Sequence, residues 1–234
     1  MQNNIITASQ KPEMTGSSLL STAYFPPIEY FAVMANSKKV IIEKCEMFQK
    51  QSYRTRCHIY SANGLLVLTV PVKRDVAISN DNTEAGRTHK QFIDKVKIDY
   101  SKPWILQHKR ALEAAYMTTP FFEYYKDDIF AVLDSGEPFL FDLNRKIIEL
   151  FNELIGISTP IEFSSDWTEF PPVGCTDFRA AIHPKSKEQN ILENMQMTKP
   201  YYQVFSDKQG FIPNLSILDL LCNEGPNSIS FLKK

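Results

Sequence analysis

Two apolar strands around one short helix limit the fold more than any other part of the sequence. Leu19–Ala23 predicts a buried strand and Ile28–Ala35 predicts a helix. Pro27 suits the start of that helix because proline lacks the N–H that is unpaired there. Lys39–Glu43 predicts a second strand. So short a strand, helix and strand form a βαβ unit, which normally pairs its strands in parallel.

The remainder of the chain predicts a β-hairpin and then a mainly helical C-terminal half. Asn63-Gly64 is a strong hairpin signal between β-rich runs. We therefore expect an α/β fold with a mixed sheet. The further strands expected are Arg56–Ser61, Leu65–Val72, Val96–Asp99 and Ile161–Phe163, and the helices are Lys102–Tyr116, capped by Ser101, Pro120–Leu133, Asp142–Ile155, Ser216–Cys222 and a last short one from Pro226. Lys73–His89 predicts a long loop that acts as a lid, and residues 164–210 predict mostly loops.

Composition is that of an ordinary globular protein, with 234 residues, 43% hydrophobic and 23% charged. We expect residues 1–17 to form a disordered polar leader and residues 18–234 a single domain. A net charge of −1 argues against a broad nucleic-acid surface. The absence of a transmembrane-length run, of an apolar signal segment and of a CxxC pair predicts a cytoplasmic protein with reduced thiols.

The Gln49–Arg56 segment gathers cations in a chain that is not basic. Arg54 and Arg56 are two residues apart, so on an extended backbone their side chains share a face. With Lys50 they predict a site for a carboxylate or phosphate, which the planar guanidinium pairs bidentately. The alternative is a solvated strand face with Glu43 or Glu46 as the partner.

His108 is the candidate for proton transfer. In a helix it shares one face with Trp104, which places it at a partly buried position where a histidine acts as a general base near neutral pH. Asp99 precedes the helix and either orients His108 or caps the turn. The alternative for His108 is a core-edge histidine bonded to a backbone carbonyl. Tyr53 and Tyr116 are candidate pocket-lining residues.

Several kinds of site are excluded by the sequence. The chain has no glycine-rich phosphate loop, no GxSxG nucleophile motif and no His, Cys or Asp spacing typical of a metal site, so we expect no metal and no cofactor. His183 lies in a polar loop and is interpreted as an exposed residue without a ligand role. Asp219 lies among leucines and is either paired or, as we favour, on the solvent side of its helix.

Six segments in the same order resemble the WbqC-like protein family. They span most of residues 19–230 and comprise Tyr24–Phe31, Gln49–Arg56, Leu68–Val72, Ile98–His108, Tyr116–Tyr125 and Phe211–Leu221. Many members carry His-Gln-Pro where this chain has Leu20, Ser21 and Thr22, and Trp where it has Pro27. If that histidine is catalytic in the family, either His108 carries the chemistry here or the activity is changed or lost.

The resemblance implies a role in surface-polysaccharide (O-antigen) biosynthesis, and a glycine-transferring role has been suggested for some members. We therefore expect an acyl- or aminoacyl-transferase that acts on a sugar precursor. Its partners would be a small-molecule or nucleotide-sugar substrate and an aminoacyl donor. The alternative is a non-catalytic binding protein for an anionic sugar or nucleotide-sugar. An RNA contact through the same cations is consistent with an aminoacyl-tRNA donor and predicts salt-sensitive binding.

Overall fold

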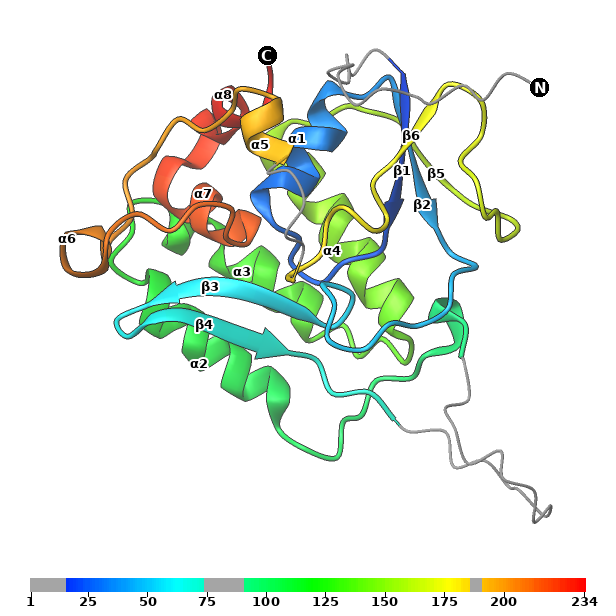
Figure 1. The fold of residues 1–234 in the computed structure, drawn as a ribbon. Coiled ribbons are helices and arrows are strands. Elements are labelled where there is room, and N and C mark those ends of the chain that lie inside the picture. Colours follow the sequence, from blue (N-terminus) through cyan, green and yellow to red (C-terminus); the bar gives the residue numbers. More distant parts are fainter. Residues whose placement is uncertain (1–15, 74–90, 186–190) are drawn as a thin grey trace.

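The computed structural model describes residues 16–73, 91–185 and 191–234, and Figure 1 shows how its elements are arranged. Most of the expected leader and of the expected lid loop lies outside these ranges, although Ser17 already begins the first strand. The strands are β1 (Ser17–Ser21), β2 (Lys39–Glu43), β3 (Arg56–Ser61), β4 (Gly64–Thr69), β5 (Ile161–Phe163) and β6 (Cys175–Asp177).

The helices are concentrated in the C-terminal half, as the sequence predicts. They are α1 (Ile28–Asn36), η1 (Ile93–Lys95), α2 (Trp104–Tyr116), α3 (Phe122–Leu133), α4 (Leu140–Ile155), α5 (Ile191–Asn194), α6 (Ser206–Gln209), α7 (Ile217–Glu224), η2 (Gly225–Ser228) and α8 (Ile229–Leu232). Along the described ranges, no helix combines the length and the apolar character that crossing a membrane requires. All four cysteines are free thiols.

Parallel and antiparallel pairing occur in two separate sheets. Four parallel strands have the order β5-β2-β1-β6, with Leu20 beside Ile42 where β1 pairs with β2. The β3–β4 hairpin forms its own two-stranded antiparallel sheet. Its turn requires Gly64, which has a φ of 94°. The α/β fold class, with its βαβ unit, hairpin and helical C-terminal half, is confirmed.

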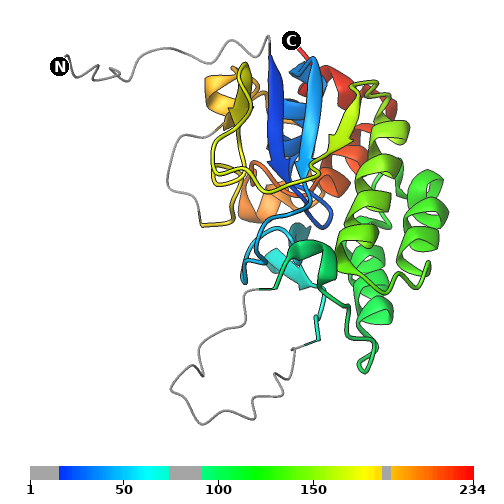
Figure 2. The same cartoon turned by 90° about the vertical axis from the view of Figure 1, so that its right-hand side faces the viewer.

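The helices α1 and α4 lie on the same side of the parallel sheet, and the hairpin packs between α2 and α7 (Figure 1). One continuous core joins these parts, since buried side chains of β1, α1, β3 and α4 belong to the same cluster. In Figure 2 the strands run downwards, and the segment that follows β5 crosses below their carboxyl ends. These ends are therefore covered by connecting segments rather than by helices.

Three local expectations are wrong in detail. β1 begins and ends two residues before the predicted strand, because its pairing with β2 sets its register. In place of a strand at Val96–Asp99, the chain forms η1 and then isolated bridges at Lys97 and Ile98. Ser101 does not cap α2, which begins at Trp104 without a side-chain cap.

Candidate functional site

The carboxyl ends of β1, β2 and β6 meet at one edge of the parallel sheet. In open α/β sheets, ligands bind outside this edge. Ser21 ends β1, Glu43 ends β2 and Asp177 ends β6, and the Ser21–Glu43 register places the first two side by side. The loop before β3 also reaches this edge. We call the region formed by these strand ends, residues 46–56 and residues 178–185 the sheet-edge site.

Arg54 is a buried ion-pair partner in the floor of the sheet-edge site. Only 3% of Arg54 and of Glu46 is exposed. The Arg54 Nε donates to Glu46 Oε1 at 2.7 Å, and its Nη2 donates to Glu46 Oε2 and, at 2.7 Å, to the Ser21 hydroxyl. Asn144 of α4 donates to the Arg54 carbonyl at 2.9 Å. Glu46 is therefore its partner, in a buried setting rather than on a solvated face.

Arg179 forms a second ion-paired centre at the same edge. Its guanidinium donates to both carboxylate oxygens of Asp177 and, at 3.2 Å, to Glu43. It also donates to the carbonyls of Thr168 and Glu169, which holds the segment below the strands in place. Burial alone would lower the pKa of Arg179, but its hydrogen bond with Asp177 and the charges of the nearby carboxylates together raise it. Arg179 therefore keeps its charge and fixes this wall.

A narrow crevice enters the molecule between these centres. Six of its lining residues are Ser21, Thr22, Tyr53, Arg54, Phe178 and Ile182. The Thr22 hydroxyl is buried and has no hydrogen-bond partner within the described part of the chain. One free polar group therefore lies in its wall.

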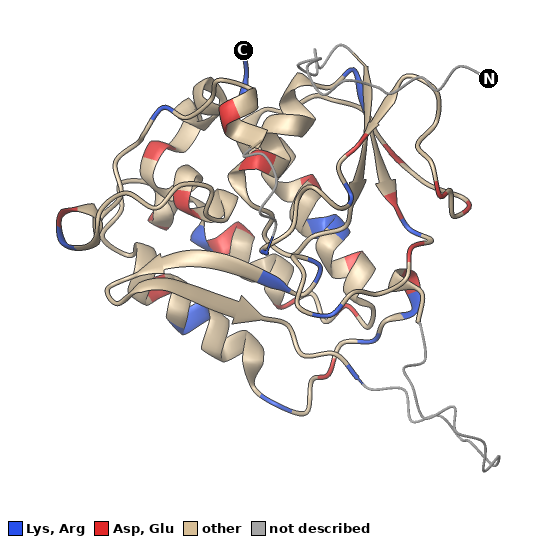
Figure 3. Ribbon diagram, in the orientation of Figure 1, with Lys and Arg blue, Asp and Glu red and all other residues tan. Residues whose placement is uncertain are grey.

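Arg56 and Lys185 supply positive charge near the crevice, and His183 lies close to both. Burial lowers the pKa of His183, and the positive charges of Arg54, Lys185 and Arg56 lower it further. Burial also lowers the pKa of half-buried His58, and the positive charge of Arg56 lowers it further. In Figure 3 basic segments appear at the start of β3 and in the loop before it. These cations therefore lie close enough to both histidines to oppose their protonation.

Arg56 differs from Arg54 in its surroundings. Residues 51–55 form turns, so the extended backbone begins only at Arg56, and the two side chains do not share a strand face as expected. Arg56 is half-buried and its buried Nε lacks a hydrogen-bond partner. Within the residues that the structure describes, no carboxylate forms an ion pair with it. Its fork is available to a ligand.

The exposed loop at Lys50 borders this group. Gln49 Oε1 accepts from Arg54 Nη1 at 3.3 Å, and Gln51 Oε1 accepts from Lys185 Nζ at 2.6 Å. These bonds join the loop to the 183–185 segment. Lys50 is exposed between the two glutamines. The loop therefore brings one more cation to the rim.

His108 and Asp99 are not partners. Asp99 accepts from the Ser101 backbone N–H at 2.9 Å, which closes a turn and lowers the Asp99 pKa. His108 is 5% exposed and its Nδ1 lies 2.8 Å from the Tyr24 hydroxyl. Burial lowers its pKa to about 4, although a hydrogen bond with the Thr69 backbone opposes the shift. His108 is therefore neutral at pH 7 and lies outside the sheet-edge crevice.

Tyr116 and Asp219 both lie in the core, although Tyr116 was expected to line a pocket and Asp219 to face solvent. Tyr116 and Asp219 are each 1% exposed, so Asp219 does not occupy the solvent side of α7. Its Oδ2 accepts from the Tyr201 hydroxyl at 2.5 Å and from Gln203 Nε2 at 2.9 Å. Burial raises the Asp219 pKa to about 6, although these bonds lower it. Asp219 fixes Tyr201 rather than facing water.

The sequence did not indicate two residues of the sheet-edge site, His183 and Arg179. Both belong to the loop-rich 164–210 region, where no periodicity gives a side chain its direction. His183 is half-buried, and its Nδ1 accepts from the Lys185 backbone N–H at 3.1 Å. The short spacing of Asp177 and Arg179 was the available signal, since Asp177 also bonds the Arg179 backbone N–H at 2.9 Å.

The site has the chemistry of an anion receptor. Arg56, Lys185 and Lys50 contribute positive charge, and the His183 Nε2 carries the proton because Nδ1 accepts a hydrogen bond. In the described ranges, no three His, Cys, Asp or Glu side chains gather as a metal ion would require. A carboxylate or phosphate matches the charge and the donors that the site presents.

Comparisons with known proteins relate the whole region to one family. Residues 22–173 and 179–231 match the model of the WbqC-like protein family. A similar protein of Mycobacterium tuberculosis, named "Uncharacterized protein Rv1507c", is 28% identical over 235 residues, covering 92% of this chain and 96% of its own. No solved structure matches. Since this match covers most of the chain, the chain belongs to the WbqC-like protein family.

Proposed function

We propose that this chain is an acyl- or aminoacyl-transferase that acts on a sugar precursor in surface-polysaccharide (O-antigen) biosynthesis. Glycine is one candidate for the transferred group. The support is twofold: the family, and a cationic receptor at the edge of the sheet where α/β proteins bind ligands. Leu20 also lines the crevice, and it is the position that the resemblance aligns with the leading histidine of many members.

The observation that carries the proposal is that Arg56 has no ion-pair partner in the described part of the chain. Arg54 and Arg179 have carboxylate partners inside the protein, whereas no described carboxylate pairs with Arg56. A ligand carboxylate or phosphate would complete its fork. Lys185 and Lys50 would add charge at the rim. The proposed ligand is therefore the anionic part of the donor or of a nucleotide-sugar.

His183 would act as a neutral hydrogen-bond donor in this function. Its lowered pKa keeps the ring uncharged at pH 7, and its Nε2–H remains to donate. A neutral donor near fixed cations suits an oxygen that gains negative charge during acyl transfer. The bound anion would also raise the pKa of His183, so its binding would strengthen as the pH falls.

The general-base role of His108 stays a separate prediction. Tyr24 occupies its Nδ1, and Tyr24 also reaches the crevice-lining Tyr53 through a backbone bond of 2.8 Å. His108 would thus act through Tyr24 rather than on the substrate directly. If it is the base, His108→Ala lowers the rate on a proven substrate by about 10²–10⁴. A wild-type rate in that variant would remove the role.

One observation favours a second candidate, a non-catalytic binding protein for an anionic sugar or nucleotide-sugar. Glu43, Glu46 and Asp177 are all bound by arginines, so none of these carboxylates is free to accept a substrate proton. Such a site binds without supplying a base. The two candidates share the receptor and differ in turnover.

Ligand binding followed by product analysis separates the candidates. Wild-type protein is mixed with nucleotide-sugars and acyl or aminoacyl donors, thermal shifts are recorded, and products are sought by mass spectrometry. A transferase gives both a shift and a product of increased mass, and Arg56→Gln loses both whereas Arg110→Gln on α2 loses neither. A shift without any product supports the binding protein. No shift with any anion contradicts both.

A further inference from the structure

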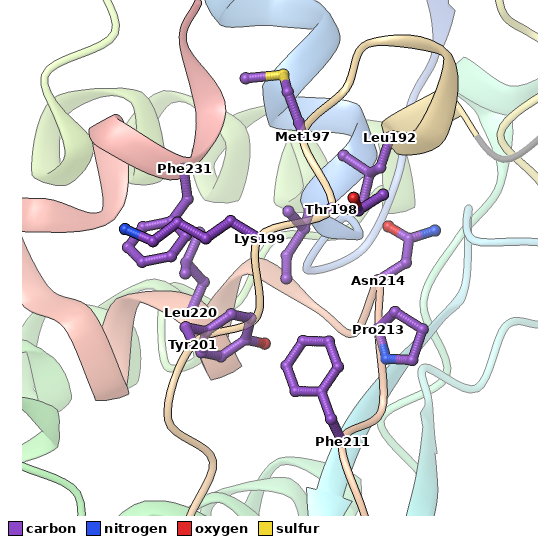
Figure 4. A pocket seen from close by; sticks show the side chains of 11 residues that line it. Leu192, Met197, Thr198, Lys199, Tyr201, Phe211, Pro213, Asn214, Leu220 and Phe231 are labelled. Atoms are coloured by element: carbon purple, nitrogen blue, oxygen red, sulfur yellow. The ribbon is translucent and has the colours of Figure 1, made fainter.

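A second pocket lies away from the sheet-edge site, between α1, α7, α8 and the segment 197–214. Its wall is mainly apolar and includes Ile28, Met197, Leu220 and Phe231 (Figure 4). Mainly apolar pockets with a few polar groups hold small organic ligands. None of the residues assigned to the sheet-edge site lines it.

Aromatic rings make one side of this pocket rigid. Tyr201 contacts Phe211 edge to face, with ring centroids 5.4 Å apart, and Phe231 at 6.0 Å. The Tyr201 hydroxyl is fixed by Asp219 at 2.5 Å and by Gln203 at 3.1 Å. A wall held in this way is ready for a ligand, because little side-chain freedom remains to be lost on binding.

Polar groups occur at only a few points of the wall. Lys199 is exposed, and its ammonium lies 4.8 Å from the centroid of the Phe231 ring. Figure 4 shows its side chain extended along that ring. Among the residues that the structure describes, no carboxylate forms an ion pair with Lys199. Thr198 and Asn214 provide further polar atoms. One positive charge thus borders an apolar cavity.

We infer that this pocket binds a small carboxylate with an apolar body, either an aryl ring or a short acyl chain. The aromatic wall would contact the body and the Lys199 ammonium would pair with the carboxylate. Charge and shape together favour this class: a carboxylate gains the attraction of the Lys199 ammonium that a neutral molecule lacks, and a highly polar molecule meets an apolar wall. The inference concerns a second site and does not depend on the proposed function.

The test compares carboxylates with their neutral analogues. Benzoate, phenylacetate and hexanoate are titrated into the full chain at low salt and followed by NMR chemical shifts, with benzyl alcohol and hexanol as neutral probes. We expect each carboxylate to bind more tightly than its alcohol. Lys199→Ala should weaken the carboxylates about two- to fivefold, as loss of an exposed ion pair does, and leave the alcohols unchanged. Lys208→Ala on α6 is the matched control.

A second variant tests the position of the pocket. Thr198 is exposed at its wall, so Thr198→Trp fills the space without disturbing the core and should abolish binding of both probe classes. A thermal melt checks that this variant is folded. The inference is overturned if carboxylates bind no better than alcohols, if Thr198→Trp binds like the wild type, or if no probe binds at millimolar concentration.

Discussion

Arg54 and Arg56 are two residues apart and yet have opposite surroundings. Arg54 is buried, and Glu46, Ser21 and Gln49 accept hydrogen bonds from its guanidinium. Arg56 is half-buried, and its Nε has no partner within the described ranges. The first arginine holds the protein together and the second remains available. The difference teaches that a run of cations in a sequence does not say which of them meets a ligand.

The comparison first predicts a large difference in stability. Arg54→Ala leaves the buried Glu46 carboxylate without its ion-pair partner and with the Ser21 hydroxyl as a remaining donor, and loss of such a buried pair typically costs about 3–5 kcal/mol. Arg56→Ala removes no ion pair that the described residues form, so its free energy of unfolding should change by less than about 1 kcal/mol. Urea unfolding of both variants measures the difference.

The double variant Arg54→Met/Glu46→Leu provides the control for this first prediction. Because it removes both charges, it should be more stable than Arg54→Ala. Equal destabilisation by Arg54→Ala and Arg56→Ala would contradict the division between a structural and a free arginine.

Asp219 extends the comparison, because it is a buried carboxylate that, unlike Glu46, has no arginine as an ion-pair partner among the described residues. Its pKa is raised from 3.8 to about 6 in the folded chain, so the folded state binds the proton more tightly than the unfolded state. The group therefore opposes folding above about pH 6, by roughly 3 kcal/mol for a shift of this size. That opposition decreases as the pH falls through 6 and disappears below about pH 4.

The measurement is unfolding by urea at pH 4.5 and at pH 7.5 in the wild type and in Asp219→Asn. The asparagine oxygen can still accept a bond from Tyr201 or Gln203. Relative to Asp219→Asn, the wild type should gain stability on going to the lower pH. An identical pH dependence in both proteins would show that Asp219 does not titrate in this range.

The main elements of the fold were predictable because their signals are local. Pro27 starts α1, and Asn63-Gly64 allows the positive φ of the hairpin turn. By contrast, β6 has three residues and exists because β1 pairs with it. A strand that short carries no period of its own. Residues 164–210 were predicted to be mostly loops, and they contain β6, an edge strand of the parallel sheet that the sequence pattern did not indicate.

The candidate site was less predictable because burial of charge is a tertiary property. The sequence offered Glu46 as a partner for the cations but could not tell which arginine it would choose. Asp219 was placed on a solvent face because helical spacing says nothing of Tyr201 and Gln203, which come from another segment. His183 could not be assigned to the site from the sequence, because only the fold brings its segment close to Arg54 and Arg56.

A smaller effect is expected at Arg56 itself, in binding rather than in stability. Arg56→Gln should weaken the binding of pyrophosphate, an inorganic probe for the site, about tenfold, because one charged hydrogen-bonding group is lost. Calorimetry at low and high salt measures it, and the wild-type affinity should fall with salt more steeply than that of the variant. Arg110→Gln serves as the control. Equal affinity in wild type and Arg56→Gln would mean that Arg56 does not contact the anion.

The smallest effect concerns Arg179, which combines features of both arginines. Its guanidinium is ion-paired with Glu43 and Asp177. The guanidinium carbon also lies 4.6 Å from the centroid of the Trp167 ring, and Trp167 is 51% exposed. Trp167→Ala should cost about 0.5–1 kcal/mol, the value of an exposed cation–π contact. Trp167→Phe should retain part of it, and urea unfolding measures both. If Trp167→Ala costs more than breaking the Arg54–Glu46 pair, burial does not decide which arginine matters for stability.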